Sequence, residues 1–356
     1  MITKFIAWAL PAIFMLLPVS ISAAEKVYVY NWTEYIPEAV LRQFTKETKI
    51  KVIYTTYDSN ETMYAKLKLV RGEGYDVVFP STYFVNKMSR EGMLQPLDHS
   101  LIPNIGELDS AVLDKEFDPG NVYSVPYMWG STGIAVNTDI IDAAMVTSWR
   151  DLWSSEYKGQ LLLQDDMREV FHMALKIKGH SSNTRDPKEI EAAYNLLKEL
   201  MPNVLLFNSD SPRLPYLAGE VNIGMIWNGE AWMAQEENPS IKYVYPAEGA
   251  NFWIDSFAIP RGAKNIGNAH KFIDFMLRPD IAVLCVEENG FASPVTTALP
   301  LLSEEVRQSE VIFPPIEVIR AGEFQTDVGE ALVIYQKYWE KLRSVSYTHL
   351  RAHETA

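Results

Sequence analysis

Apolar and polar residues alternate along the first hundred positions in blocks that predict strands followed by helices. Short apolar runs at 27–30, 50–54 and 75–79 are bounded by turn residues, as buried strands usually are. Each run precedes a segment whose apolar residues recur every three or four positions and so share one face of a helix. Strands that alternate with helices favour a mostly parallel sheet with helices on both faces. The pattern therefore predicts an α/β fold.

Helix start signals sharpen the expected boundaries. Pro37 can open a helix, because the N–H that proline lacks would have no partner at the first helical position. The segment 58–61 is rich in residues that cap helix N-termini. Asp186 and Glu189 have the spacing of a capping box, with Pro187 at the first helical position. We expect helices to begin at these three places.

The remainder of the chain repeats the pattern less regularly. Residues 99–130 are rich in Pro, Asp and Gly and predict an irregular segment ahead of a strand at Ile134–Val136. Further apolar runs predict strands at Leu161–Leu163, Val221–Trp227 and 251–260. A helical period predicts helices over 268–277, 279–290 and, with an interruption at 323–327, 303–342.

Both ends of the chain are expected to lie outside the fold. Lys4 precedes an apolar run and then small residues up to Ala24, which is the pattern of a secretory signal peptide over residues 1–24. No later stretch is long and apolar enough to predict a membrane span, so we expect a mature protein that is not embedded in a membrane. Residues 344–356 show no apolar period, and we expect them to be a non-native tail.

Composition narrows the classes of partner. The formal net charge is −14, and Lys4, which leaves with the signal peptide, makes the mature chain more acidic still. A strongly acidic exported protein is a poor partner for nucleic acid and a suitable one for cationic ligands. Cys285 is the single cysteine, so no intramolecular disulfide can form.

Aromatic and acidic residues gather at the ends of predicted strands, where ligands bind in open α/β sheets. Trp32, Thr33, Glu34 and Tyr35 follow the first strand. Trp253 and Asp255, two positions apart, share one side of a later strand. The residues alone leave other interpretations open, because Glu34 could be a helix-start acid and Trp253 a core residue.

A third group, Asp166 and Glu169, follows the strand Leu161–Leu163. These two residues are also spaced as an N-cap and its N3 partner, so they fit a capping box as well as a ligand site. Both roles can coexist where a helix begins at a cleft.

The order of these motifs resembles that of the spermidine/putrescine-binding proteins of bacterial polyamine ABC importers. The likeness extends from Lys26 to Arg343. Its matching stretches are Tyr30–Tyr35, Phe44–Thr48, Ser59–Leu67, Pro80–Tyr83 and Gly224–Gly229.

The resemblance implies a two-lobed, type II periplasmic binding fold with the ligand cleft between lobes that close by a hinge. One lobe would comprise 25–132 and 252–299, and the other 133–251 and 300–343. The implied protein is a periplasmic monomer that uses no cofactor or metal ion, has no enzymatic activity, and works with a membrane permease and its cytoplasmic ATPase. The implied ligand contacts are Trp32, Thr33, Glu34, Tyr35, Ser81, Tyr83, Asp166, Glu169, Trp227, Trp253, Asp255, Phe291 and Gln325.

One position departs from the family pattern. Spermidine binders of this family usually carry a tyrosine in a Gly-Tyr-x-x-Pro stretch, whereas this chain has Phe291 between Gly290 and Ala292. One hydroxyl contact is therefore absent, and with it part of the selectivity that the resemblance would imply.

The chemistry of the candidate residues suits a polyamine. Each buried ammonium needs a carboxylate partner, because an unpaired buried ion costs several kcal/mol. Aromatic faces attract cations and also cover methylene groups. Four carboxylates, those of Glu34, Asp166, Glu169 and Asp255, balance the three charges of spermidine.

Two alternatives of other classes remain. A ferric-iron-binding protein of the same fold would need converging tyrosines or histidines, and the chain has 18 tyrosines. A glycosidase could use two carboxylates such as Asp166 and Glu169. However, the sequence lacks a nucleophile pattern, a Gly-rich phosphate loop and metal-spaced histidines, since His172 and His180 each stand alone.

Overall fold

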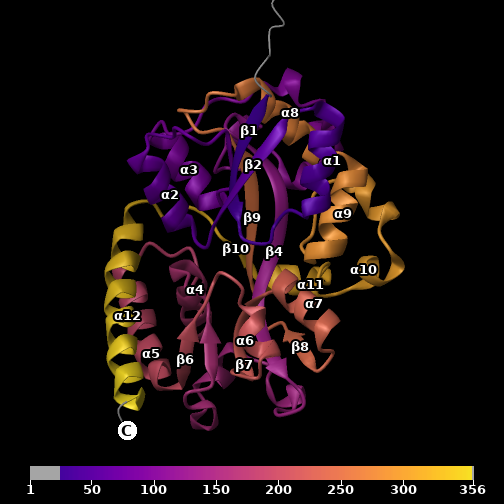
Figure 1. Cartoon of the computed structure of the whole chain (residues 1–356). Coiled ribbons are helices and arrows are strands. Elements are labelled where there is room, and N and C mark those ends of the chain that lie inside the picture. The colour runs from indigo at the N-terminus through magenta and orange to yellow at the C-terminus, as the bar shows by residue number, and fades with distance from the viewer. Residues whose placement is uncertain (1–24, 355–356) are drawn as a thin grey trace, which may run out of the picture.

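One curled sheet of ten strands runs through both halves of the molecule in the computed structural model, which describes residues 25–354 (Figure 1). The predicted signal peptide lies outside the described residues. The strand order is β2 (Lys51–Tyr57), β1 (Lys26–Trp32), β3 (Val77–Val78), β9 (Asn251–Ala258), β4 (Ser124–Asn137), β7 (Ile223–Trp227), β5 (Leu161–Leu163), β6 (Val204–Phe207). Two further strands join this path, since β10 (Glu323–Phe324) pairs with β9 and β8 (Ile241–Val244) pairs with β4.

The sheet is parallel at its two ends and antiparallel at its centre. In the upper half of Figure 1, β1 pairs in parallel with β2 and β3. In the lower half, β5 pairs in parallel with β6 and β7. The long strands β4 and β9 are antiparallel neighbours that lead from one half into the other. The predicted two-lobed α/β architecture is confirmed.

The strand β4 is much longer than the sequence predicts. It spans Ser124–Asn137, whereas only Ile134–Val136 was expected to be extended. Nearly all its residues are buried, so the alternation of apolar and polar positions that marks a half-exposed strand is missing. Gly130 also looks like a turn residue, but it is needed for close packing. A Cβ there would lie 2.5 Å from the ring of Trp253.

Helices cover the sheet in the upper half. The long apolar residues of this half form a core around Phe44, whose ring contacts Phe272 and Phe275 at centroid distances of 5.1 and 5.2 Å. Pro37 is the N-cap of the first helix and lies just outside it, one position before the expected place. The helices are α1 (Glu38–Thr48), α2 (Asn60–Leu69), α3 (Thr82–Arg90), α8 (Ile266–Met276) and α9 (Pro279–Asn289).

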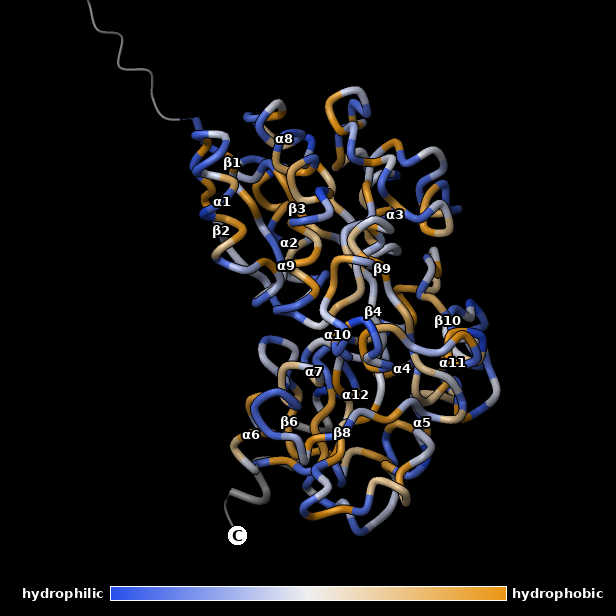
Figure 2. Tube along the Cα trace, turned by 90° about the vertical axis from the view of Figure 1, so that its right-hand side faces the viewer, coloured by the Kyte–Doolittle hydropathy of each residue, from blue (hydrophilic) through white to orange (hydrophobic). Residues whose placement is uncertain are grey.

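A separate core fills the lower half, where Phe171 packs edge-on against Tyr335 at 5.2 Å. Seen at right angles to Figure 1, the two halves are joined through the region of β4 and β9 (Figure 2). The residue boundaries of the two lobes stay a prediction. The remaining helices are α4 (Met167–Ile177), α5 (Pro187–Leu200), α6 (Arg213–Leu217), α7 (Asn228–Glu237), α10 (Glu304–Gln308), α11 (Ile316–Ala321) and α12 (Leu332–Glu354).

Helix α12 continues past the predicted end at residue 342, so the backbone of the tail is helical as far as Glu354. That the tail is non-native stays a prediction. Across residues 25–354, no helix has the length and hydropathy to cross a membrane.

The predicted N-cap residues are confirmed at two helices, but the predicted capping-box partner is not. Ser59 accepts a hydrogen bond from the N–H of Thr62, and Asp186 accepts one from the N–H of Lys188. The predicted capping box at Asp186 is wrong, because the Glu189 carboxylate instead accepts a hydrogen bond from the hydroxyl of Thr184.

Candidate functional site

A pocket lies between the two halves of the molecule. All but two of the predicted ligand contacts line it, the exceptions being Glu34 and Tyr83. The lining residues are Trp32, Thr33, Tyr35, Asn60, Ser81, Asp166, Glu169, Ser209, Asp210, Trp227, Glu230, Trp253, Asp255, Phe291 and Gln325.

Asp255 projects into the pocket from β9, on the same side of the strand as Trp253. Its carboxylate accepts hydrogen bonds from the hydroxyls of Ser81, at 2.6 Å, and Tyr35, at 2.9 Å. Burial raises the pKa of Asp255 to about 7, although these two donors oppose the shift. Because both donors are neutral, the carboxylate gains no counter-charge from them.

The N-terminus of α4 supplies two more buried carboxyl groups. One oxygen of Asp166 accepts the N–H groups of Arg168, at 2.8 Å, and Glu169, at 3.1 Å, so Asp166 is the N-cap. Glu169 does not bond back to the cap. It accepts hydrogen bonds from the amides of Asn251, at 2.8 Å, and Gln325, at 3.1 Å. The predicted capping box is therefore only half formed.

The pKa values of both groups at α4 are raised. Burial is the main cause for Asp166 and for Glu169, and the nearby charge of Asp166 raises the pKa of Glu169 further. Glu169 is 3% exposed and Asp166 is 7% exposed. The arrangement disfavours two negative charges here unless a cation joins them.

Arg168 is the cation next in sequence to Asp166, but its side chain extends away from the pocket. Its guanidinium donates to the carbonyl oxygen of Thr326 and to the side chain of Asn183. It also lies 5.2 Å from the ring centre of Tyr83. Tyr83, a predicted ligand contact, does not line the pocket.

Aromatic rings form the walls between the carboxyl groups. Trp32 and Trp227 meet edge to face with centroids 6.2 Å apart, and the indole N–H of Trp32 donates to the carbonyl oxygen of Phe79. Phe291 contacts Tyr35 at 5.3 Å and Trp253 at 5.4 Å. These rings present faces and edges that suit methylene groups and cations.

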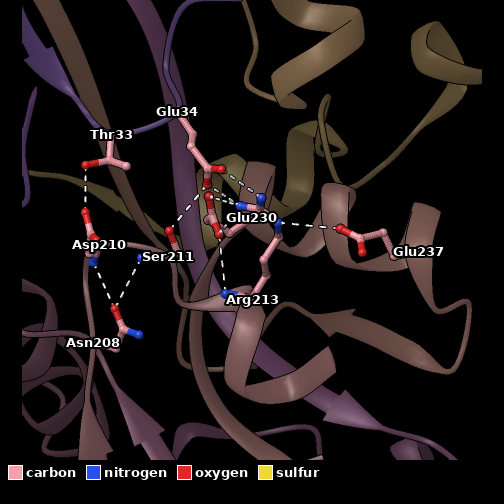
Figure 3. Close-up of polar contacts among 8 residues, drawn as sticks. All are labelled: Thr33, Glu34, Asn208, Asp210, Ser211, Arg213, Glu230 and Glu237. Carbon is pink, nitrogen blue, oxygen red and sulfur yellow. Dashed lines mark hydrogen bonds and ion pairs between the residues drawn. The ribbon is translucent and has the colours of Figure 1, made fainter. Parts of the chain in front are cut away.

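The mouth of the pocket is bridged by polar contacts between the two halves (Figure 3). The hydroxyl of Thr33, after β1, donates to Asp210 at 2.7 Å. The guanidinium of Arg213, at the start of α6, binds both carboxylate oxygens of Glu34, at 2.5 and 3.0 Å. Arg213 also donates to Glu230 at 3.1 Å. The Glu34 carboxylate is thus directed at Arg213, and Glu34 is not among the lining residues.

The two acids at the mouth differ in their titration. Hydrogen bonding to Arg213 holds the pKa of Glu34 below its usual value. Burial raises the pKa of Glu230 to about 7, although Arg213 opposes this shift. Glu230 is 5% exposed and lines the pocket.

The comparisons with known proteins agree with this geometry. Residues 39–314 match the family model described as a bacterial extracellular solute-binding protein. The chain belongs to this family. The spermidine/putrescine-binding periplasmic protein of Escherichia coli (strain K12) is 57% identical over 318 residues, which cover 89% of this chain and 91% of that protein. Spermidine/putrescine-binding periplasmic protein 1 of Haemophilus influenzae (strain ATCC 51907 / DSM 11121 / KW20 / Rd) is 45% identical over 325 residues, which cover 91% and 90%.

Solved structures of solute-binding proteins share the fold. A putative spermidine/putrescine ABC transporter from Listeria monocytogenes superposes with a TM-score of 0.86 and 36% identity, covering 90% of this chain and 99% of that one. The resemblance to polyamine-binding proteins that the motifs predict is therefore confirmed.

Four residues of this solute-binding protein's pocket were not predicted, namely Asn60, Ser209, Asp210 and Glu230. Glu230 lies three positions after the predicted strand end at Trp227, so the sequence could have predicted that it lies near the pocket. Arg213 carries no local signal, since its partner Glu34 is 179 positions away. Within residues 25–354, no cluster of His, Cys, Asp and Glu side chains is arranged to hold a metal ion.

Proposed function

We propose that the protein captures a polyamine in the periplasm, preferring spermidine and also accepting putrescine, and delivers it to the permease of an ABC transporter. The observation that carries this proposal is the set of buried carboxyl groups of Asp166, Glu169 and Asp255. All three line one pocket, and the side chains that donate to Glu169 and Asp255 are neutral.

A polyamine complements this set in charge and in shape. Each buried carboxylate without a counter-charge costs several kcal/mol, and an ammonium in hydrogen-bond contact removes much of that cost. The methylene groups between ammonium charges need apolar cover, which Trp32, Trp227 and Trp253 can supply. The names of the curated relatives, which bind spermidine and putrescine, support the same ligand class.

The ferric-iron alternative is less well supported. Among the described residues that line the pocket, Tyr35 is the one tyrosine, and its hydroxyl donates to Asp255. A ferric site would need several phenolate or imidazole ligands that converge on one point. The pocket offers this ion too few such groups.

The glycosidase alternative meets a different difficulty. Of its two acids, Asp166 commits one carboxylate oxygen to the N-cap of α4, where that oxygen accepts two backbone N–H groups. Glycoside hydrolysis needs one free acid and one free base or nucleophile. We therefore propose a binding protein without enzymatic activity, and the relatives named as binding proteins support this.

Delivery would follow the closing of the two halves over the ligand. The contacts Thr33–Asp210 and Glu34–Arg213 bridge the mouth and favour a closed form. We propose a monomer that docks on a membrane permease with a cytoplasmic ATPase. Vesicles that contain only the purified protein should show no polyamine movement.

The function is tested by calorimetry on ligand-stripped mature protein with putrescine, cadaverine, spermidine and spermine, and with ferric iron in parallel. We expect one polyamine bound per chain. At about 100 times its dissociation constant the ligand should add ~2.7 kcal/mol to the free energy of unfolding. Absence of both heat and thermal stabilisation with all four amines would refute the proposal, and saturable iron binding would favour the alternative.

A further inference from the structure

Arg213 places a positive charge of the protein itself at the mouth of the pocket. Its side chain is 12% exposed and lies between Glu34, which comes from the other half of the molecule, and Glu230 (Figure 3). The Nε atom is 3.8 Å from a carboxylate oxygen of Glu237. One guanidinium therefore forms ion pairs with three acidic side chains.

The contact with Glu34 uses the full donor geometry of arginine. Two nitrogens of the guanidinium bind the two oxygens of the carboxylate, at 2.5 and 3.0 Å. Such paired hydrogen bonds are the strongest that a carboxylate makes with a side chain, and they fix its direction. The hydroxyl of Ser211, 3.4 Å away, is a further donor to Glu34. Both oxygens of Glu34 are thus engaged by protein groups.

Glu230 and Asp210 show where a ligand would meet this cluster. Both line the pocket, and Glu230 accepts from the same guanidinium that holds Glu34. An ammonium that reached the mouth would have to share Glu230 with Arg213 or displace the guanidinium. By contrast, Asp255 and Glu169, deeper in the pocket, receive hydrogen bonds from neutral side chains.

Resting on the polyamine-binding function proposed above, we propose that Arg213 is a specificity-determining residue that occupies the ammonium position beside Glu34. A diamine can place both charges among Asp166, Glu169 and Asp255. A triamine has a third charge, which must compete with the guanidinium at the mouth. Arg213 therefore reduces the ratio by which this pocket prefers spermidine to putrescine.

The direct test compares putrescine and spermidine by calorimetry in the native protein and in Arg213→Gln. The ratio of the putrescine to the spermidine dissociation constant should rise by about tenfold or more in the variant, the scale expected for a close charged pair. Arg42→Gln is the matched control, because it removes the same charge from an exposed ion pair with Glu38 that does not line the pocket. An unchanged ratio in Arg213→Gln would overturn the inference.

Glu34→Gln, made in both backgrounds, provides a second test. In the native background Glu34 is held by Arg213, so spermidine binding should weaken by no more than about threefold, as for a charge at the rim. In the Arg213→Gln background, Glu34 is free for the ammonium, and its loss should weaken spermidine by about tenfold. Equal losses in both backgrounds would contradict the proposal.

The two proposals fail in different ways. If the native protein binds neither amine, the proposed function fails and this inference falls with it. If it binds both amines and the ratio of their dissociation constants is the same in Arg213→Gln, only this inference fails. If circular dichroism shows that Arg213→Gln does not fold, the spermidine affinity of Glu34→Gln in the native background still tests the inference. A loss of more than about tenfold in spermidine affinity there would mean that Glu34 contacts the ligand directly.

Discussion

The inner pocket and its mouth both contain acidic side chains, but these acids have different partners. At the inner end, Asp255 and Glu169 receive hydrogen bonds from hydroxyl and amide groups. At the mouth, Glu34 and Glu230 share the guanidinium of Arg213. Among the described residues, neither Asp255 nor Glu169 forms an ion pair, and the charge of Arg168 is only a lesser influence on the pKa of Glu169. The acids at the mouth already share a cation.

This difference assigns separate tasks to the two regions. Burial penalises an ionised carboxyl group, and neutral donors repay only part of the cost. The inner acids should consequently gain most from a bound ammonium and supply most of the affinity. The mouth, which is already neutralised in part, should influence closing and the choice between amines. Variants in each region can test this division.

The largest effect should come from Asp255→Asn. An ammonium next to the amide would lose its ionic partner, so spermidine binding should weaken by ~2–5 kcal/mol, as when one member of a buried charged pair is removed. Glu169→Gln should behave alike. Calorimetry would measure both, with circular dichroism to establish that the fold is intact.

Asp210→Asn is the matched control at the mouth, because an amide oxygen can still accept from the hydroxyl of Thr33. Its cost should stay below ~1 kcal/mol, the range of exposed charges. If Asp255→Asn bound spermidine as tightly as the native protein, the inner region would not be the source of affinity.

The next effect is a dependence of affinity on pH. The pKa of Asp255 is raised to about 7 in the ligand-free protein, and a bound ammonium must lower it. Below pH 7 the ligand has to expel this proton, so affinity should rise as the pH increases from 6 to 8. The change should approach tenfold, or ~1.4 kcal/mol, per pH unit on the acidic side. Calorimetry in two buffers of different ionisation enthalpy should show release of protons.

The same shift affects the stability of the ligand-free protein. Because the folded pKa of Asp255 is raised, its stabilising contribution is fully present below the unfolded pKa of ~4 and is lost as the pH rises through about 7. Asp255→Asn should therefore lose less stability between pH 5 and 8 than the native protein. Spermidine affinity that is constant over this range would count against an unpaired inner carboxyl group.

Much of the fold and of the inner site could be predicted, because their signals are local. The strand Leu161–Leu163 and the cap at Ser59 lie where the pattern places them. Trp253 and Asp255 line the pocket together because residues two apart on a strand face one side. The motif order supplied the rest of the inner residues through family resemblance.

The mouth could not be predicted in the same way, since its contacts join segments far apart in the chain. Arg213 follows no pattern in its own helix, and only the fold brings it to Glu34. Tyr83 is the converse case, and its contact with the ligand stays a prediction. It belongs to a matching motif, yet the guanidinium of Arg168 lies against its ring and it does not line the pocket. Competition between protein groups for the same partner is not visible in motif order.

A smaller effect is expected at Phe291, in the inner region. The ring lines the pocket and is 5% exposed, so a hydroxyl added to it could accept a hydrogen bond from an ammonium. Phe291→Tyr should tighten one of the two amines by ~1 kcal/mol, after allowing for desolvation of the new hydroxyl. Titration of putrescine and spermidine would show an unequal gain.

Phe313→Tyr is a suitable control, because Phe313 does not line the pocket. This variant should bind both amines with the affinities of the native protein. Unchanged affinities in Phe291→Tyr would mean that no ammonium approaches this ring. The tyrosine contact of the family should then not be assigned to position 291.

The smallest effect should come from Thr33→Val at the mouth. This change keeps the shape of the side chain and removes the hydroxyl that donates to Asp210 across the two halves. Because the contact is exposed, its loss should cost only ~0.5 kcal/mol of affinity, the lower end of the range for hydrogen bonds. The loss should appear as faster dissociation in stopped-flow measurements, since the contact holds the closed form. Thr33→Ser retains the hydroxyl and should dissociate at the native rate. If serine were as costly as valine, packing of the methyl group would explain the effect, and the hydrogen bond across the mouth would have no part in closing.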